Sequence, residues 1–255
     1  MSSALVVGSP LRVGGKALQR SSAIAVLIGL ASYQAVSQEA GSRAGDMRHE
    51  FAGYWDRAVG TDVWWPVSPG SYEGVPFTPA GLAAQKALEE DPEENYPALR
   101  CEFNFGLIVS FADLEIITQP NDRVIMTYPS YEQKIRWIWT DGRDHPEGAT
   151  DRPMFMGYSV GRWEQGEEGQ TLVVETIGVE PGYLRQDGLP NTADIRIAER
   201  YTLINDGQDL ALELTIDDPN YYTQPWMVSM AYTRGEPPQT LHPVCRVGPE
   251  YHGTG

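Results

Sequence analysis

The chain has 255 residues, 41% of them hydrophobic, which suffices for a packed core and excludes disorder as the class. Its 19 Lys and Arg residues stand against 35 Asp and Glu residues, so the formal net charge is −16. This charge repels a phosphate backbone or an anionic membrane surface, and neither nucleic acid nor such a surface is therefore an expected partner.

The N-terminal segment has the order of a secretory signal peptide. Basic residues within 12–20 precede the apolar stretch 23–31, and small residues at 35–37 offer a cleavage site. The apolar stretch is shorter than the ~20 residues that a spanning helix needs. Residues 1–37 are therefore predicted to be a signal peptide, with a buried N-terminal helix as the alternative. Residues 38–255 are predicted to form one exported domain, periplasmic or extracellular, without membrane insertion after processing.

Export places the two cysteines, Cys101 and Cys245, in an oxidising compartment, where they are predicted to form a disulfide. Such a bond closes a long loop and destabilises the unfolded chain by about 3 to 5 kcal/mol. Two distant cysteines without a C-x-x-C pair lack the spacing of a structural zinc site. No metal and no other cofactor is expected.

Residues 79–90 are the main helical segment, and short strands follow from about Phe103 onward. In the strand predicted at 134–140, one face carries Ile135, Trp137 and Trp139. Asp141-Gly142 ends this strand.

The best hairpin signal lies near the C-terminal end. Two alternating runs, 195–203 and 210–216, flank the turn at Asn205-Asp206-Gly207. Sequential hairpins, without a helix long enough for a parallel crossover, predict an all-β fold. We expect an antiparallel meander that closes into a calycin or lipocalin-like barrel. A β-sandwich is the alternative, because alternation does not show that the first and last strands pair.

Several segments, taken in their order along the chain, resemble a family of exported bacterial β-rich proteins. These segments are 77–81 (F-T-P-A-G), 115–120 (E-I-I-T-Q-P), 141–146 (D-G-R-D-H-P), 156–163 (M-G-Y-S-V-G-R-W) and 216–226 (I-D-D-P-N-Y-Y-T-Q-P-W), together with Cys101. The resemblance implies export and brings no activity with it. One departure is Asn191, where the family tends to have a histidine. In addition, Gly53-Tyr54-Trp55 resembles the G-x-W of lipocalin-type barrels, whose tryptophan plugs one end.

The segment 157–161 reads G-Y-S-V-G, the G-x-S-x-G pattern of the α/β-hydrolase nucleophile elbow. Asp217 or Asp218 and then His242 follow Ser159 in the matching chain order. An elbow, however, needs a helix directly after its strand, and here a glycine-rich turn and a second strand follow. A serine hydrolase is therefore the least favoured function. The small residues of the pattern indicate either strand curvature or a pocket floor.

Two other positions suggest acid–base or ionic chemistry. Glu199 interrupts an apolar strand face, and a buried carboxylate must find a partner, for which Arg162, Arg136 and Arg200 are the candidates. His145 lies in a turn at a strand end, where barrel mouths bind ligands. Each has a structural alternative: an internal ion pair for Glu199, and a bond to backbone or water for His145.

Two functions of different classes follow. The first is an exported barrel that binds a small, partly apolar molecule in its cavity, with arginine orienting the ligand. The second is a cofactor-independent isomerase, lyase or cyclase in the same cavity. The candidate catalytic residues are His145, Asp141 and Glu199. The candidate ligand-binding residues are Tyr128, Arg136, Trp137, Arg143, Tyr158, Ser159, Arg162 and Trp163.

Overall fold

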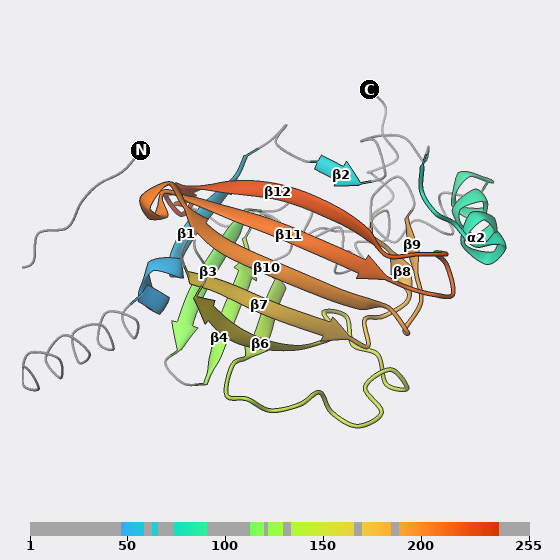
Figure 1. The fold of residues 1–255 in the computed structure, drawn as a ribbon, viewed down its shortest axis with the longest axis horizontal. Coiled ribbons are helices and arrows are strands. Elements are labelled where there is room, and N and C mark those ends of the chain that lie inside the picture. Colours follow the sequence, from blue (N-terminus) through green and yellow to red (C-terminus); the bar gives the residue numbers. More distant parts are fainter. Residues whose placement is uncertain are drawn as a thin grey trace, which may run out of the picture. The chain divides into compact units, whose positions relative to one another are not determined.

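The described part of the chain forms a closed β-barrel with one α-helix beside it (Figure 1). The structure is a computed structural model and describes residues 47–58, 63–65, 74–90, 113–119, 122–129, 134–165, 170–184 and 189–239, all within one compact unit. The predicted signal peptide and the predicted disulfide lie outside these residues and stay predictions.

Nine strands of the described residues close the barrel. In spatial order they are β1 (Gly53–Arg57), β3 (Leu114–Gln119), β4 (Arg123–Tyr128), β5 (Lys134–Trp139), β6 (Tyr158–Gln165), β7 (Gln170–Ile177), β10 (Arg196–Ile204), β11 (Asp209–Asp217) and β12 (Trp226–Gly235). The closing pair is β1 with β12, which runs from Tyr54 opposite Gly235 to Arg57 opposite Tyr232. This closure confirms the barrel over the sandwich.

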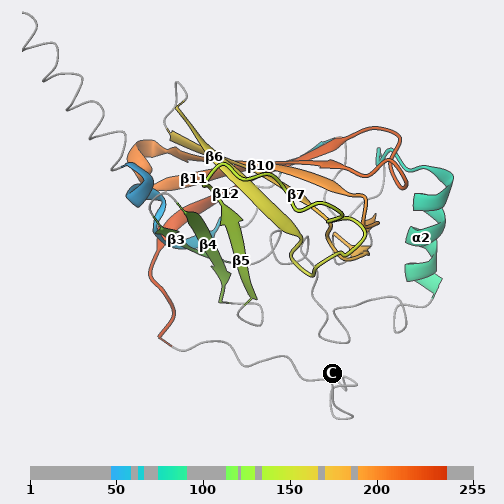
Figure 2. The same ribbon diagram turned by 90° about the horizontal axis from the view of Figure 1, so that it is seen from below.

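The smaller elements flank the barrel. They are the 3₁₀ turns η1 (Met47–Phe51) and η3 (Asn205–Gly207), the helix α2 (Pro79–Glu90), and the short strands β2 (Val63–Trp65), β8 (Gly182–Tyr183) and β9 (Pro190–Asn191). Helix α2 has the predicted bounds, and the Thr78 hydroxyl caps it by accepting the Gly81 N–H at 3.1 Å. Figures 1 and 2 show α2 beyond the barrel end opposite to η1. No helix of the described residues is long and apolar enough to cross a membrane.

The predicted hairpin is confirmed in β10 and β11, which pair from Arg196 opposite Asp217 to Ile204 opposite Asp209. Their turn uses Asn205 and Asp206 at positive φ, a conformation that these two residue types tolerate better than most. Alternate side chains along both strands are buried and join the apolar cluster inside the barrel.

The end of the barrel next to η1 is organised around Trp55, which is fully buried. Its indole N–H donates to the Phe51 carbonyl at 3.0 Å, and the guanidinium of Arg234 lies 4.3 Å from a ring centroid of the indole. Arg234 also donates to the Ala52 carbonyl at 3.2 Å. The G-x-W segment, η1 and the last strand are thus held together at this end.

One neighbouring pair departs from an antiparallel meander: β5 and β6 run parallel. Parallel neighbours need a long crossover, which is usually a helix, but here residues 140–157 cross as turns and irregular chain. The parallel pairing joins only Ile138 to Ser159 and Trp139 to Val160. Residues 134–137, the first part of β5, are therefore not paired with β6.

Candidate functional site

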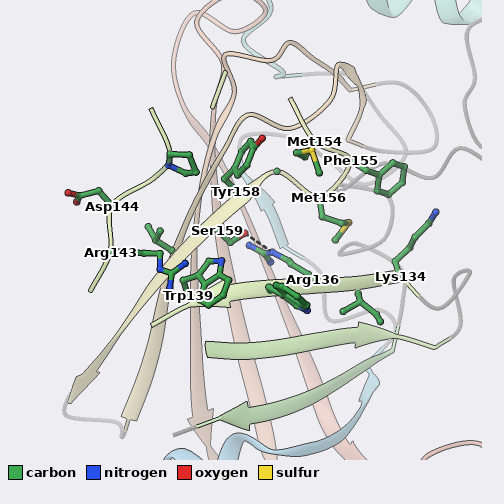
Figure 3. Close-up of a pocket in the computed structure, with 15 residues that line it drawn as sticks. Lys134, Arg136, Trp139, Arg143, Asp144, Met154, Phe155, Met156, Tyr158 and Ser159 are labelled. Carbon is green, nitrogen blue, oxygen red and sulfur yellow. Dashed lines mark hydrogen bonds between the residues drawn. The ribbon is translucent and has the colours of Figure 1, made fainter. Parts of the chain in front are cut away.

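A cavity of about 480 Å³ lies where β5 separates from β6 (Figure 3). The crossover 140–157 folds back over this gap and supplies much of the wall. The lining residues are Lys134, Ile135, Arg136, Trp137, Trp139, Arg143, Asp144, Pro146, Met154, Phe155, Met156, Gly157, Tyr158, Ser159 and Val160. The cavity thus exists because the parallel pairing is short.

The gap turns backbone groups toward the cavity. In an antiparallel ladder, alternate residues direct their N–H and C=O groups to the same neighbour. The Thr140 N–H donates to the carbonyl of Asp122, the residue directly before β4, at 2.9 Å, so Arg136 and Ile138 also direct their backbone groups to β4. The N–H and C=O of Ile135 must then point the other way, toward the cavity.

The far wall of the cavity is apolar. Met154, Phe155 and Met156 project from the crossover, and the Lys134 ammonium lies 4.4 Å from the centroid of the Phe155 ring (Figure 3). Methionine side chains adapt to ligands of varied shape because they are flexible and polarisable. This wall suits an apolar ligand surface.

At its floor the cavity is lined by Arg136 of β5, which forms a buried ion pair with Glu199 of β10. The two side chains are 1% and 0% exposed. The Nη1 of Arg136 donates to Glu199 Oε1 at 2.8 Å, and its Nη2 donates to Oε2. Of the three arginines that the sequence offered as partners for Glu199, the structure selects Arg136, because inward positions on the two strands bring them together.

Hydroxyl groups complete this network. The Nε of Arg136 donates to Ser159 Oγ at 3.0 Å, and its Nη2 donates to Thr176 Oγ1 at 2.7 Å. Ser159 and Thr176 also bond to each other at 2.9 Å, and the Tyr201 hydroxyl donates to Glu199 Oε1 at 2.7 Å. A buried ion pair needs such additional hydrogen bonds to offset the free energy that desolvation of its two charges costs.

The shifted pKa values of Arg136, Tyr128 and Tyr201 favour a charged guanidinium and neutral phenols in the network. Burial by itself lowers the pKa of Arg136, but the charge and hydrogen bonds of Glu199 outweigh it and raise the pKa overall. Burial raises the pKa of Tyr128 to about 12, against the opposing effect of the Arg136 charge. Burial, assisted by the Glu199 charge, likewise raises the pKa of Tyr201 well above its ordinary value. Both phenols are therefore neutral at physiological pH.

The rim carries a second arginine–carboxylate pair, Arg143 with Asp141. Gly142 lies between them at φ +84°, and this left-handed turn folds Arg143 back onto its neighbour. The Nε of Arg143 donates to both carboxylate oxygens, at 2.9 and 3.0 Å, and its Nη2 donates to Oδ2 at 2.6 Å. These hydrogen bonds lower the pKa of Asp141. The guanidinium also stacks on Trp139, with Cζ 3.6 Å from a ring centroid.

The three candidate catalytic residues do not meet. Glu199 lies inside the network behind Arg136, and Asp141 is paired with Arg143. The Nε2 of His145 lies 3.1 Å from the carbonyl oxygen of Glu175, which is the backbone contact that the sequence offered as the structural alternative for this histidine. None of the three is among the residues that line the cavity.

The candidate ligand-binding residues divide into two groups. Those that line the cavity are Arg136, Trp137, Arg143, Tyr158 and Ser159. The other three lie elsewhere: Tyr128 is buried beside the network, Arg162 points outward and pairs with Glu164 at 2.9 Å, and Trp163 packs edge-on against Phe51 at 4.9 Å.

Sequence reasoning missed the segment Met154-Phe155-Met156 as a ligand wall. The available signal was three large apolar residues in a row without strand alternation, next to a glycine-rich motif. It also missed Lys134, Trp139 and Asp144, because only the crossover brings these residues to one cavity.

The G-x-S-x-G segment is not an elbow in the structure. Ser159 is the second residue of β6, which continues as a strand to Gln165 and pairs with β7. Asp218 accepts hydrogen bonds from Thr192, and His242 lies outside the described residues. Gly157, at φ +63°, turns the chain into β6, and a Cβ there would approach Thr176 Cγ2 to 2.8 Å.

The chain matches no protein-family model, no curated protein and no solved structure. Among the described residues, no group of three His, Cys, Asp or Glu side chains is placed to hold a metal ion.

Proposed function

We propose that the protein binds a small, partly apolar molecule in the cavity between β5 and β6. The observation that carries this proposal is the combination, in one cavity of about 480 Å³, of an apolar wall with a few fixed polar groups. Small-molecule sites typically have this composition and volumes of about 300 to 1,000 Å³. The apolar wall supplies burial for the ligand, and the polar groups set its orientation.

The rigidity of the floor supports binding over catalysis. Arg136 and Glu199 satisfy each other, and Ser159 bonds to Arg136 and Thr176, so these groups hold the shape of the site. A general base needs a lone pair that can reach the substrate. Glu199 accepts from Arg136 and Tyr201 instead, which favours the binding protein over the isomerase, lyase or cyclase.

We also propose that the chain is an exported member of the bacterial family that it resembles. Two segments that carry the resemblance, 141–146 and 156–163, contribute to the same cavity, which supports a shared binding role. The packing of Arg234 and η1 on Trp55 supports the likeness to lipocalin-type barrels. N-terminal sequencing of the protein from the cell envelope tests export: a mature chain that begins near residue 38 is expected, and an intact N-terminus in the cytoplasm would contradict it.

Two measurements test binding. Native mass spectrometry of the purified exported protein looks for a co-purifying small molecule. A fluorescence titration with N-phenyl-1-naphthylamine, a neutral apolar probe, then measures affinity in the wild type and in Ile135→Trp. Ile135 lies at the cavity mouth with 59% exposure, so the larger ring narrows the site with little cost to the core.

The matched control is Ile117→Trp, the same exchange at a 42% exposed isoleucine of β3, outside the cavity lining. We expect Ile135→Trp to weaken probe binding tenfold or more, about 1.4 kcal/mol, and Ile117→Trp to leave it unchanged. Equal affinity in all three proteins, or no saturable binding in any, would refute the proposed site.

A further inference from the structure

The cavity has one chemically distinct end, the stack of Arg143 on Trp139. We propose that the ligand is an amphipathic organic anion, with an apolar body and one acidic group, and that Arg143 holds the acidic group. This inference rests on the proposed binding function and names the class of molecule that the site takes.

The first argument is the number of donors that remain on Arg143. Guanidinium has five N–H donors in a fixed plane, and Asp141 accepts from Nε and Nη2 only. The Nη1 group has no partner among the described residues, and the side chain is 45% exposed. Asp141 thus fixes the Nε–Nη2 edge of the Arg143 guanidinium, Trp139 stacks on its plane, and the Nη1 side is open. A guanidinium that is oriented in this way is suited to bind a carboxylate or another planar or tetrahedral oxyanion.

The second argument is the contrast with Arg136, the other arginine of the lining. Its Nε, Nη1 and Nη2 all donate within the buried network, to Ser159, Glu199 and Thr176. A ligand anion at Arg136 would have to displace Glu199, which is fully buried. Of the two arginines of the cavity, Arg143 is therefore the one that can accept a new anionic partner.

The third argument is the separation of the two ends. Figure 3 shows Arg143 and Trp139 at one side of the cavity and Met156 and Phe155 at the other, where the Lys134 ammonium lies against the Phe155 ring. A ligand that meets Arg143 at one side and packs on Met156 and Phe155 at the other must carry an acidic group at one end and apolar surface at the other. The geometry therefore favours an amphipathic molecule over one that is uniformly polar or uniformly apolar.

The fourth argument is local charge. The chain as a whole is acidic, with 35 Asp and Glu against 19 Lys and Arg. At the cavity, Glu199 balances Arg136, Asp141 balances Arg143, and the lining adds one further cation, Lys134, and one exposed carboxylate, Asp144. The cavity is therefore close to neutral, and it repels an anionic ligand less than the acidic surface of the chain does.

The test uses two probes with one arylaminonaphthalene skeleton: anionic 1-anilinonaphthalene-8-sulfonate and neutral N-phenyl-1-naphthylamine. The full-length mature protein and its Arg143→Gln variant are titrated with both, with thermal melting as the check of folding. We expect Arg143→Gln to weaken the sulfonate probe about tenfold and to leave the neutral probe unchanged. Arg143→Lys, which keeps the charge but loses the fork, should lie between the two.

The matched control is Arg162→Gln, because Arg162 also pairs with an acidic residue two positions away and is 59% exposed, but does not line the cavity. It should change neither affinity. If Arg143→Gln leaves the sulfonate probe unaffected, or weakens both probes alike, the assignment of an anion to Arg143 is wrong while the binding function stands. If neither probe binds the wild type saturably, the proposed function fails and the inference fails with it.

Discussion

Two arginines of the β5–crossover segment, Arg136 and Arg143, each pair with a carboxylate, and the two pairs differ in almost every respect. Arg136 and Glu199 are buried, come from strands far apart in sequence, and have hydroxyl partners on Ser159, Thr176 and Tyr201. Arg143 and Asp141 are exposed, lie two residues apart, and leave one edge of the guanidinium open.

The difference teaches that the surroundings of an arginine decide what it does. A buried cation is retained only when its partners are complete, so the Arg136 pair stabilises the barrel and fixes the register of its strands. An exposed, half-satisfied cation adds little to stability and remains available to a ligand. Stability and binding should therefore respond to mutation at different pairs.

The largest effect is expected for Glu199→Gln, which removes the charge that balances Arg136 inside the barrel. An unpaired buried charge costs about 3 to 5 kcal/mol. Urea denaturation followed by tryptophan fluorescence measures the loss in the free energy of unfolding. The double variant Arg136→Met, Glu199→Leu should recover most of that loss. A loss below about 1 kcal/mol in the single variant would contradict a buried, structural pair.

Gly157→Ala should cause the second-largest loss of stability, because it places a Cβ at φ +63° within 2.8 Å of Thr176 Cγ2 and Val179 Cγ2. The left-handed backbone and the overpacking together cost about 2 to 4 kcal/mol. Gly142→Ala is the control, since its φ is +84° but nothing described lies within 4 Å of the added Cβ. Thermal melting of both variants gives the comparison, and equal losses would show that Gly157 is not crowded.

An alkaline pH dependence is expected from Tyr128, whose pKa burial raises to about 12. The unfolded phenol loses its proton near pH 10, whereas the folded one keeps it, so stability is complete below pH 10 and falls between pH 10 and 12. The loss amounts to about 2 to 3 kcal/mol. Tyr128→Phe should reduce this decline when unfolding is measured from pH 8 to 12, and Tyr201, whose pKa burial also raises, should account for the decline that remains. An unchanged slope would place the alkaline loss on other groups.

Asp141→Asn should have the smallest effect on stability, although it is the same carboxylate-to-amide exchange as at Glu199. Exposed ion pairs contribute little because water screens them. The midpoint of thermal unfolding should stay within experimental error of the wild type. A fall in the unfolding midpoint as large as that caused by Glu199→Gln would contradict the claim that only the buried pair stabilises the barrel.

Much of the fold was predictable because local patterns govern it. The helix at 79–90 and the hairpin of β10 and β11 follow from periodicity and from turn residues. The parallel step between β5 and β6 was not predictable, because no helix marks the crossover. Ten of the fifteen residues that line the cavity, Met154 and Phe155 among them, were consequently not among the predicted site residues.

The candidate site was predictable only residue by residue. Glu199 was singled out as a carboxylate on an apolar strand face, but alternation could not choose its partner among three arginines. The register of β5 made that choice by turning Arg136 inward. The same register turns Ile135 and Trp137 outward. The sequence had placed these two residues on one face of the strand, but it did not determine whether that face is inside or outside the barrel.

The most direct test of the central claim is a nitrogen–proton correlation spectrum of the labelled mature protein during titration with N-phenyl-1-naphthylamine. We predict that the largest shifts fall on the amides of Ile135, Trp137 and Phe155 and on the indole groups of Trp137 and Trp139. Saturating probe without shifts in these residues, or with shifts confined to β10, β11 and β12, would contradict a binding site between β5 and β6.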